Sequence, residues 1–451
     1  KRTIVKRICT SLFVGILTED LAEQAIRLVN RQHMVYPDNP FFLYFALGAG
    51  HAPHQAPKEY IDHYKGAFDA GWDEIREQWF ANQKRLGIVP ENTVLNPRNE
   101  FVKPWNELTD DEKKVYARYM EVYAGFLEHA DAQIGKVVDY LKEIGEFENT
   151  VIVLLSDNGA SAEGGKNGRV NQEKSLNLLE ETNNVELTLK HLEELGSSAY
   201  SNPHYPVGWA NAGNTPFQWY KSWVHSGGVK DPLIVSYPKG IHAKGEIRNQ
   251  SLHVIDIAPT ILDILGVDKP DHIKGIAQKP YHGASFAGTF DNAEAPDVRH
   301  IQYYEQTGNR GIWKDGWKAI TNHIYDKDYI NETWELYHVA KDFSESENVA
   351  EQYPDKLKEL IALWYVQAGK YGVLPLGDGS YLTQKPEELL NVVKENKFYI
   401  EPQKFSYHGV LHPLDITTKT MFNRRNHKIT VQIAHEPDQE GILYAAGNRF
   451  G

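Results

Sequence analysis

The sequence predicts an α/β protein, built on a mixed, mostly parallel sheet flanked by helices and ending in a small C-terminal antiparallel subdomain. Apolar strand-like runs alternate with long helical patterns over residues 1–300. Such alternation is typical of a parallel sheet covered on both faces. Farther along, short aromatic-rich runs are separated by turn residues, which favours antiparallel strands. Hydrophobic residues make up 41% of the chain, which is enough for a large core.

The first elements follow from apolar spacing and capping signals. Thr18 is expected to cap a helix over 18–31, because apolar residues recur there on one face. The run FFLYFALGAGHAPH predicts a buried strand over 41–47 that ends in a loop. The tetrapeptide T-D-D-E is a capping box and predicts a long helix over 109–144, before Gly145.

The next elements repeat this alternation. VIVLLSDNGASAEGG predicts a strand from Val151 that stops at polar residues, and PLIVSYP predicts another strand over 232–238. Between them, residues 166–200 are polar with one helical patch and are expected to form an insertion at the rim. HVIDIAPTILDILGV predicts a helix over 259–265. In α/β sheets ligands bind beyond the carboxyl ends of the strands, where both polar clusters noted so far lie.

The remaining sequence predicts three further parts. RGIWKDGWKAI and WELYHVAKDFSESENVA indicate short antiparallel strands, closed by a helix over 355–371. We therefore expect a main domain over 1–300 and a small sheet-plus-helix subdomain over 301–375. A linker over 376–407 and the start of a β-rich accessory module over 408–451 would follow.

Charge and cysteine content limit the partners. Subtracting 61 acidic from 48 basic residues gives a net charge of −13, which disfavours nucleic acid and anionic membranes. An anion would need a local positive cluster. Cys9 is the single cysteine, so an internal disulfide and a multi-cysteine zinc site are excluded. No run of about 18 apolar residues occurs, so no membrane span is expected. Compartment and oligomeric state are not readable from the sequence.

Adjacent oxygen donors end the strand that starts at Val151. Asp157 and Asn158 offer a carboxylate and a carbonyl oxygen, hard donors that suit calcium or magnesium. Gly159 allows the backbone to turn there. Asp, Asn and Gly also form ordinary turns, and taken alone the S-D-N-G stretch favours that interpretation.

Other polar residues could carry chemistry in the same way. His51 could act as a general acid near an anion, or it could bind a metal together with His54. Lys221 precedes the glycine pair of SWVHSGGV and could hold an anion beside backbone N–H groups. Glu163 and His225 are weaker candidates. In isolation, each of these residues is as compatible with an ordinary surface or packing role.

The ordered combination of motifs is more specific than any one of them. FFLYFALGAGHAPH, YAGFLEHADAQIGKVVDYL, NTVIVLLSDNGASAEGG, KSWVHSGGVKDPLIVSYPKGI, HVIDIAPTILDILG and WELYHVAKDFSESENVA occur in this order. In this respect the chain closely resembles the type I sulfatases, bacterial arylsulfatases of the alkaline phosphatase superfamily. The resemblance covers nearly the whole chain.

That resemblance implies an arylsulfatase activity, the hydrolysis of small-molecule sulfate monoesters with bound Ca²⁺, or Mg²⁺ as the alternative. It implies that Asp157 and Asn158 are metal ligands. It also implies that His51 protonates the leaving oxygen and that Lys221 holds the sulfate, so these two residues would be both catalytic and substrate-binding.

Departures from the family pattern matter equally. The family's Asp-Asp metal pair and its Cys-x-Pro-x-Arg segment, whose cysteine becomes the formylglycine nucleophile, are not found in this sequence. Cys9 lies in C-T-S-L-F and lacks the required proline and arginine. Ser226 and Lys230 replace the usual Glu and Arg around the glycine pair. We therefore expect a fragment that lacks the formylglycine region and the end of the C-terminal β module, and that is inactive alone.

Two alternatives stay open at this point. One is a phosphate or phosphonate ester hydrolase of the same superfamily, since sulfate and phosphate are both tetrahedral oxyanions. The other is a non-catalytic sulfatase-like binding protein that has lost its nucleophile.

Overall fold

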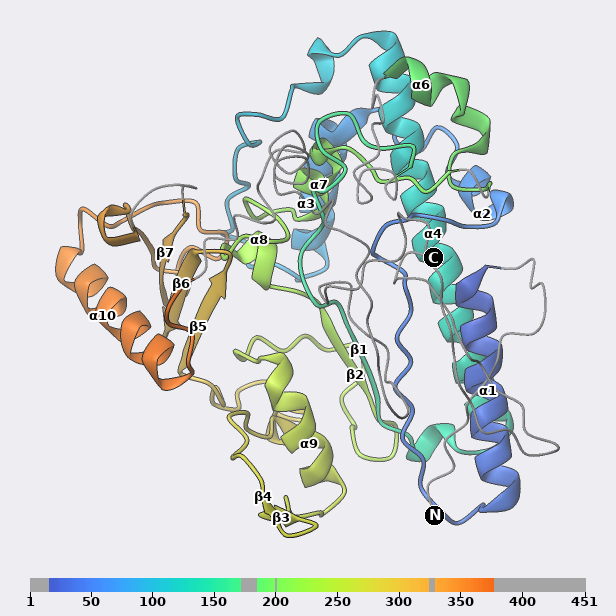
Figure 1. Ribbon diagram of the computed structural model, residues 1–451, viewed down its shortest axis with the longest axis vertical. Helices are drawn as coiled ribbons and strands as arrows, with labels where there is room; N and C mark the ends of the chain where they lie inside the picture. Colours follow the sequence, from blue (N-terminus) through green and yellow to red (C-terminus); the bar gives the residue numbers. More distant parts are fainter. Residues whose placement is uncertain (1–15, 172–184, 199–200, 324–328, 377–451) are drawn as a thin grey trace, which may run out of the picture. The chain divides into compact units, whose positions relative to one another are not determined.

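The computed structural model describes residues 16–171, 185–198, 201–323 and 329–376 (Figure 1). Within these ranges, helices combine with three small antiparallel sheets, so the α/β class and the small antiparallel C-terminal subdomain are confirmed. The predicted linker, the predicted accessory module and Cys9 lie outside the described residues. None of the described helices combines the length and the apolar character that crossing a bilayer requires.

Two long helices form one side of the main part and lie next to each other in Figure 1. Helix α4 (Asp110–Glu143) begins with the predicted capping box, in which the Thr109 side chain accepts from Glu112 N and the Glu112 carboxylate accepts from Thr109 N. Helix α1 (Leu17–Val35) starts one residue before the predicted range of 18–31. Ile16 is its N-cap, so the prediction that Thr18 caps this helix is wrong. Thr18 is instead buried inside the first turn.

An aromatic core fills the space around α4. It collects side chains from α2 (Lys58–His63), α3 (Gly71–Arg85), α6 (Val185–Lys190) and α7 (Val207–Gly213). The Trp72 ring packs edge-on against Trp105 and Trp209, with centroids 4.8 and 5.9 Å apart. Leu195 is fully buried in this core. The expected rim insertion therefore contributes to the core in its second half, and residues 172–184 and 199–200 lie outside the described ranges.

The predicted metal ligands Asp157 and Asn158 follow the first strand of a two-stranded sheet. Strand β1 (Ile152–Leu155) pairs antiparallel with β2 (Leu233–Ser236), with Ile152 opposite Ser236. Both strands were predicted. The prediction was a mixed, mostly parallel sheet. Among the described residues, the predicted strands of the main domain that form are these two, and they pair antiparallel.

Residues 41–47 do not form the predicted strand. Exposure alternates along this segment as it would in a strand, and Phe42 and Tyr44 are 81% and 83% exposed. A strand also requires a backbone partner, and within the described ranges no segment forms a ladder with this one. The segment is therefore extended but unassigned, with Leu43 and Phe45 packed near α1.

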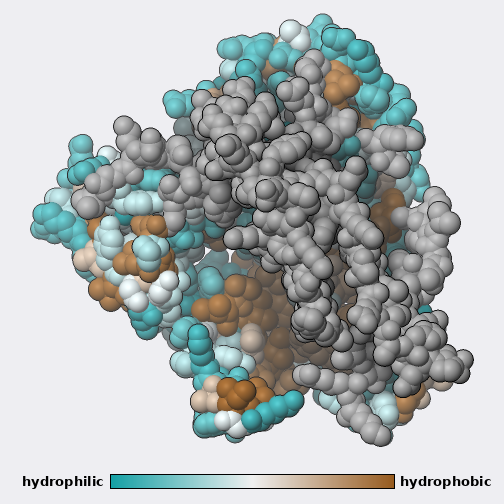
Figure 2. All heavy atoms as spheres, viewed as in Figure 1, coloured by the Kyte–Doolittle hydropathy of each residue, from teal (hydrophilic) through white to brown (hydrophobic). Residues whose placement is uncertain are grey.

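The region after β2 is a helix with a small hairpin. Helix α9 (Ile257–Ile264) follows the turn η4 (Val254–Asp256), and the hairpin pairs β3 (His272–Ile273) with β4 (Ile276–Ala277). The predicted helix over 259–265 is thus confirmed. Several apolar side chains of this region are exposed, and Figure 2 shows brown side chains over the hairpin. Asp256 is fully buried beneath α9 and forms an ion pair with Arg299.

The C-terminal subdomain is a four-stranded antiparallel sheet in the order β5-β6-β7-β8. Its strands are β5 (Ile301–Gln306), β6 (Asn309–Lys314), β7 (Trp317–Thr321) and β8 (Glu335–Tyr337). Helix α10 (Pro354–Lys370) covers one face, with Leu360 and Trp364 fully buried against the sheet. The remaining short elements are α8 (Ser226–Val229), η1 (Trp105–Glu107), η2 (Phe147–Asn149), η3 (Leu192–Glu194), η5 (Ala287–Thr289) and η6 (Tyr329–Asn331).

Candidate active site

The candidate site contains a histidine and a lysine from distant segments. His51 Nε2 lies 3.2 Å from Lys221 Nζ. His51 Nδ1 lies 2.7 Å from the carbonyl oxygen of Ala52, and because a carbonyl only accepts, Nδ1 carries the ring hydrogen and donates it. Nε2 is then the acceptor for the lysine ammonium. The structure thus brings together the two residues that the sequence predicted as catalytic.

Glu163 completes this cluster. Its carboxylate Oε1 lies 3.0 Å from Lys221 Nζ, and Oε2 lies 3.9 Å from His51 Nε2. Partial burial alone would raise the pKa of Glu163, but the charge and hydrogen bond of Lys221 outweigh it and lower that pKa. Glu163 was only a weaker candidate in the sequence, because four residues of loop separate it from Asn158 and no spacing rule relates it to Lys221.

Lys221 lies on a strained loop over residues 219–225, which is called the lysine loop below. Trp219 and Ser222, on either side of Lys221, have φ values of 62° and 76°, in the left-handed region that residues other than glycine rarely adopt. Such strain persists where surrounding contacts fix the backbone, and it is common at functional sites. Here the rings of Trp219 and Trp223 stack with centroids 3.9 Å apart, which fixes the loop on one side.

The turn after β1 is joined to the lysine loop by its backbone. Gly159 N donates to Gly228 O at 3.2 Å, and Lys221 N donates to Ala160 O at 3.0 Å. A Cβ on Gly159 would lie 1.8 Å from Gly227 O. The prediction that glycine is needed here is therefore supported by close backbone approach, since Gly159 is not among the residues with positive φ.

Asn214 bridges the same two loops, although no motif or spacing rule pointed to it. Its Oδ1 accepts from Ala160 N and its Nδ2 donates to Trp219 O, both at 2.9 Å. One side chain therefore holds the oxygen-donor turn and the lysine loop in fixed register.

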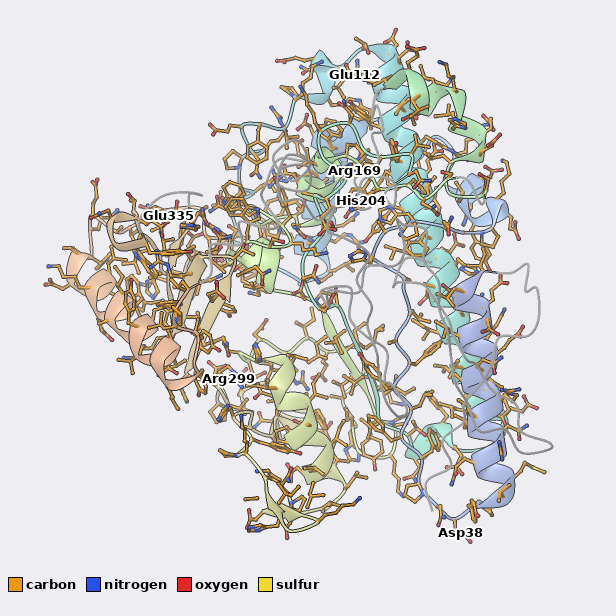
Figure 3. The ribbon with its side chains drawn as sticks, viewed as in Figure 1. Asp38, Glu112, Arg169, His204, Arg299 and Glu335 are labelled. Atoms are coloured by element: carbon orange, nitrogen blue, oxygen red, sulfur yellow. The ribbon has the colours of Figure 1, made fainter. Side chains whose placement is uncertain are left out.

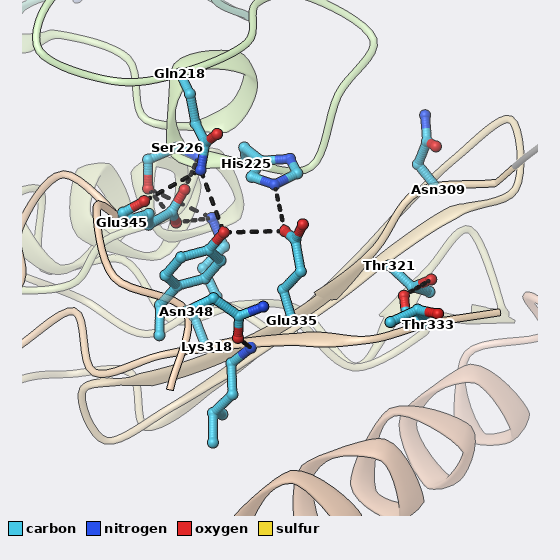
Figure 4. Close-up of polar contacts among 12 residues, drawn as sticks. Gln218, His225, Ser226, Asn309, Lys318, Thr321, Thr333, Glu335, Glu345 and Asn348 are labelled. Atoms are coloured by element: carbon cyan, nitrogen blue, oxygen red, sulfur yellow. Dashed lines mark hydrogen bonds and ion pairs between the residues drawn. The ribbon is translucent and has the colours of Figure 1, made fainter. Parts of the chain in front are cut away.

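A buried ionic network anchors the lysine loop to the C-terminal sheet (Figure 4). Glu345 accepts from Ser226 N at 2.8 Å and from Ser226 Oγ and Lys318 Nζ at 2.7 Å each. Burial alone would raise the pKa of Glu345, but Lys318, His225 and these hydrogen bonds lower it. Ser226, noted in the sequence as a departure from the family pattern, thus donates two hydrogen bonds to a carboxylate from another part of the chain.

His225 belongs to this anchor as well. It is buried, and its Nε2 lies 3.0 Å from Glu335 Oε2, which also accepts from the Tyr337 hydroxyl. The Glu335 side chain is labelled in Figures 3 and 4. His225 therefore contacts the sheet, which supports a packing role.

The second histidine of the HAPH motif has different partners from the first. His54 is buried, and its ring lies 4.9 Å from that of His204, which Figure 3 labels. His204 Nε2 accepts from Ser161 Oγ at 3.0 Å, and burial lowers the pKa of His204 to about 4. Burial likewise lowers the pKa of His54, so both rings are neutral near pH 7. The structure does not bring His51 and His54 together as a metal-binding pair.

The predicted metal ligands lie at the end of β1. Asp157 is exposed, and Ser156 Oγ donates to the backbone carbonyl of Asn158 at 3.1 Å. A second carboxylate, Asp231, was not predicted; burial and then the negative charge of Asp157 raise the pKa of Asp231 to about 7. Within the described ranges, no set of three or more His, Cys, Asp and Glu side chains is arranged to hold a metal ion.

Comparison with known proteins identifies the family. The family model described as Sulfatase matches residues 3–267, and the model described as N-sulphoglucosamine sulphohydrolase, C-terminal, matches residues 216–363. The first match spans more than half of the chain. This chain therefore belongs to the sulfatase family, as its motifs indicated.

Individual relatives agree with this assignment. An uncharacterized sulfatase of Schizosaccharomyces pombe is 36% identical over 342 residues, which are 75% of this chain and 59% of the relative. An arylsulfatase of Klebsiella aerogenes is 34% identical over 244 residues, which are 54% of this chain and 49% of the relative. The chain thus spans about half of the length of one of these relatives and about three fifths of the other. Among solved structures, that of Ps i-CgsB has a TM-score of 0.48 at 18% identity, covering 85% of this chain and 60% of the other.

Proposed function

We propose that this chain forms one side of the active site of an arylsulfatase, a hydrolase of small-molecule sulfate monoesters. The observation that carries the proposal is the contact between His51 Nε2 and Lys221 Nζ, 3.2 Å apart although the residues are 170 positions apart in sequence. A cation and a proton-transfer group so close together suit a substrate that has an anionic head and a leaving oxygen. Membership of the sulfatase family supports the same conclusion.

Each residue has a role that follows from its geometry. Lys221 would bind a sulfate oxygen, because its ammonium is a compact positive charge. The loop that carries it is held by the stacked rings of Trp219 and Trp223 and by the hydrogen bond from Lys221 N to Ala160 O. When its ring is protonated on both nitrogens, His51 would deliver a proton to the leaving oxygen from Nε2, since the hydrogen on Nδ1 is donated to Ala52 O. The carbonyl contact also fixes the plane of the ring, so Nε2 keeps its direction while the proton is transferred.

The oxygen donors after β1 are of the type that binds a hard divalent cation, but two of them are too few to complete its coordination. Asp157 and Asn158 would supply a carboxylate and an amide oxygen to Ca²⁺, with Mg²⁺ as the alternative. Calcium takes six to eight oxygen ligands, so further ligands would have to come from elsewhere. When bound, the cation would draw electron density from the sulfate oxygens. The backbone contacts through Gly159 and Asn214 would keep Asp157 and Asn158 in register with Lys221.

The nucleophile is the part of the proposal that the described residues do not supply. By family resemblance, formylglycine would provide it from an upstream Cys-x-Pro-x-Arg segment. We propose that the 451-residue chain alone binds sulfate esters but does not hydrolyse them.

Two measurements test the proposal on the purified chain. Binding of phenyl sulfate is expected to move the NMR resonance of the His51 ring, identified by its loss in His51→Gln, and Lys221→Met is expected to remove the binding. Turnover of 4-nitrophenyl sulfate should be undetectable with or without Ca²⁺. No binding of phenyl sulfate would refute the anion site, and calcium-dependent turnover by this chain would refute its inactivity.

A further inference from the structure

The charge balance of the His51, Lys221 and Glu163 cluster carries an inference about selectivity. We infer that Glu163 is a specificity-determining residue, whose carboxylate shifts the preference of the site toward singly charged sulfate esters and away from doubly charged phosphate monoesters. This inference rests on the proposed function, because it concerns the anion bound by Lys221. Glu163 is not assigned a part in bond breaking.

The geometry gives the site a small net charge. Lys221 contributes one positive charge, Glu163 contributes one negative charge 3.0 Å away, and His51 is neutral when its Nε2 accepts from Lys221. These three side chains then sum to zero before the substrate arrives. A sulfate monoester brings one negative charge, whereas a phosphate monoester brings nearly two above its second pKa of about 6.

Proximity makes this difference measurable. An anion bound to Lys221 would lie roughly 6 Å from the Glu163 carboxylate, so the second phosphate charge adds a repulsion that depends on the local dielectric. The side chains of Glu163 and His51 are 45% and 53% exposed, which calls for a dielectric nearer to that of water than of the interior. Coulomb's law then gives a contribution from the Glu163 charge of roughly fivefold against the dianion, relative to the same site without that charge.

The other groups around Glu163 do not cancel this effect. Its neighbours are His204 and Tyr205 behind the loop, and Arg169 Nε, which donates to the Glu163 carbonyl. Burial keeps His204 and Tyr205 neutral across the neutral pH range, because it lowers the pKa of the first and raises that of the second. Lys221 and its neighbours lower the pKa of Glu163 despite its partial burial, so its carboxylate stays charged in mildly acidic solution.

The side chain of Glu163 can be replaced without affecting the core. Its carboxylate is exposed and contacts only His51 and Lys221 among the described residues. Glu163→Gln removes the charge at nearly constant shape, and Glu163→Asp keeps the charge. Glu186→Gln is the matched control, because Glu186 forms an exposed pair with Lys190 at 2.8 Å on α6.

The experiment measures binding of phenyl sulfate and phenyl phosphate to the 451-residue chain through the His51 ring resonance. At pH 8, Glu163→Gln should shift the ratio of the two dissociation constants roughly fivefold toward the phosphate, as Coulomb's law estimates. Glu163→Asp and Glu186→Gln should leave the ratio close to that of the unmodified chain. At pH 5 phenyl phosphate is mostly a monoanion, so the effect of Glu163→Gln should disappear.

The outcomes separate this inference from the proposed function. If both ligands bind but the ratio is unchanged in Glu163→Gln at pH 8, the inference about Glu163 is wrong and the anion site stands. A shift that persists undiminished at pH 5 would also overturn the inference, because charge could not be its cause. If neither ligand binds, both the anion site and the inference are refuted.

Discussion

Replacing Gly159 by alanine tests whether backbone contact sets the geometry of the site. The new Cβ would lie 1.8 Å from Gly227 O and 2.9 Å from Gly227 C, both backbone atoms that cannot rotate away. Overpacking of this kind costs about 1–3 kcal/mol. Separating the loops would also weaken the hydrogen bonds from Gly159 N to Gly228 O and from Ala160 N to Asn214 Oδ1, at about 1 kcal/mol each. We therefore expect a loss of about 3–5 kcal/mol in the free energy of unfolding.

The matched control is Gly135→Ala on α4. No heavy atom lies within 4 Å of the position that its Cβ would occupy, and its φ is not positive. Alanine should therefore stabilise this helix by about 0.5–1 kcal/mol. Urea unfolding followed by tryptophan fluorescence and by far-UV circular dichroism would measure both variants, provided that the two probes give coincident transitions.

One result would refute this reasoning about Gly159. If Gly159→Ala unfolds at the urea midpoint of the unmodified chain, with an unchanged slope and unchanged phenyl sulfate binding, the contact with Gly227 does not determine the geometry. A loss of stability together with unchanged binding would show that the contact between Gly159 and Gly227 stabilises the fold but does not set the geometry of the site.

Three further predictions follow from other contacts. Lys318→Met removes the buried cation next to Glu345 and should lower stability by about 3 kcal/mol, measured in urea; a loss below about 1 kcal/mol would contradict a paired buried charge. Asp231 has its pKa raised to about 7 by burial and Asp157, so the folded state retains a proton that the unfolded state has lost. Stability should therefore fall as pH rises from about 4 to 7. Asp231→Asn should abolish that fall in stability. If the fall persists in this variant, Asp231 is not the group that causes it. Asn214→Ala should cost about 2 kcal/mol and weaken phenyl sulfate binding, and unimpaired binding would show that the two loops hold their register without it.

Local signals in the sequence predicted local structure well. The capping box at Thr109 involves residues three positions apart, and the helix begins there as expected. The hairpin between β6 and β7 likewise follows from the turn at Asp315 and Gly316, both with positive φ. The segment 41–47 shows the limit of such signals. Its apolar, aromatic run is typical of a buried strand, but pairing depends on a partner that its own residues do not specify.

The site shows the same limit. From residue type, strand ends and motif order, the sequence predicted His51, Lys221, Asp157 and Asn158 as site residues, and the structure brings the first two together. The sequence could not show that Asn214 joins two loops, because an asparagine in a turn-rich stretch has an ordinary local explanation. Contacts of this kind join residues far apart in the sequence, and only the folded chain shows which side chains meet.

The net charge of −13 does not prevent this chain from binding an anion, because the relevant charges are local. At physiological salt the Debye length is about 8 Å, so most of the acidic surface is screened from the site. Lys221 and Glu163 are closer to each other than that length. Selectivity should therefore depend on these two charges and on their distance to the ligand. The effect of Glu163→Gln on the sulfate-to-phosphate ratio should shrink as salt is raised to about 1 M, where the screening length of about 3 Å is comparable to the distances within the cluster. An effect of the same size at both salt concentrations would instead indicate direct contact between Glu163 and the ligand.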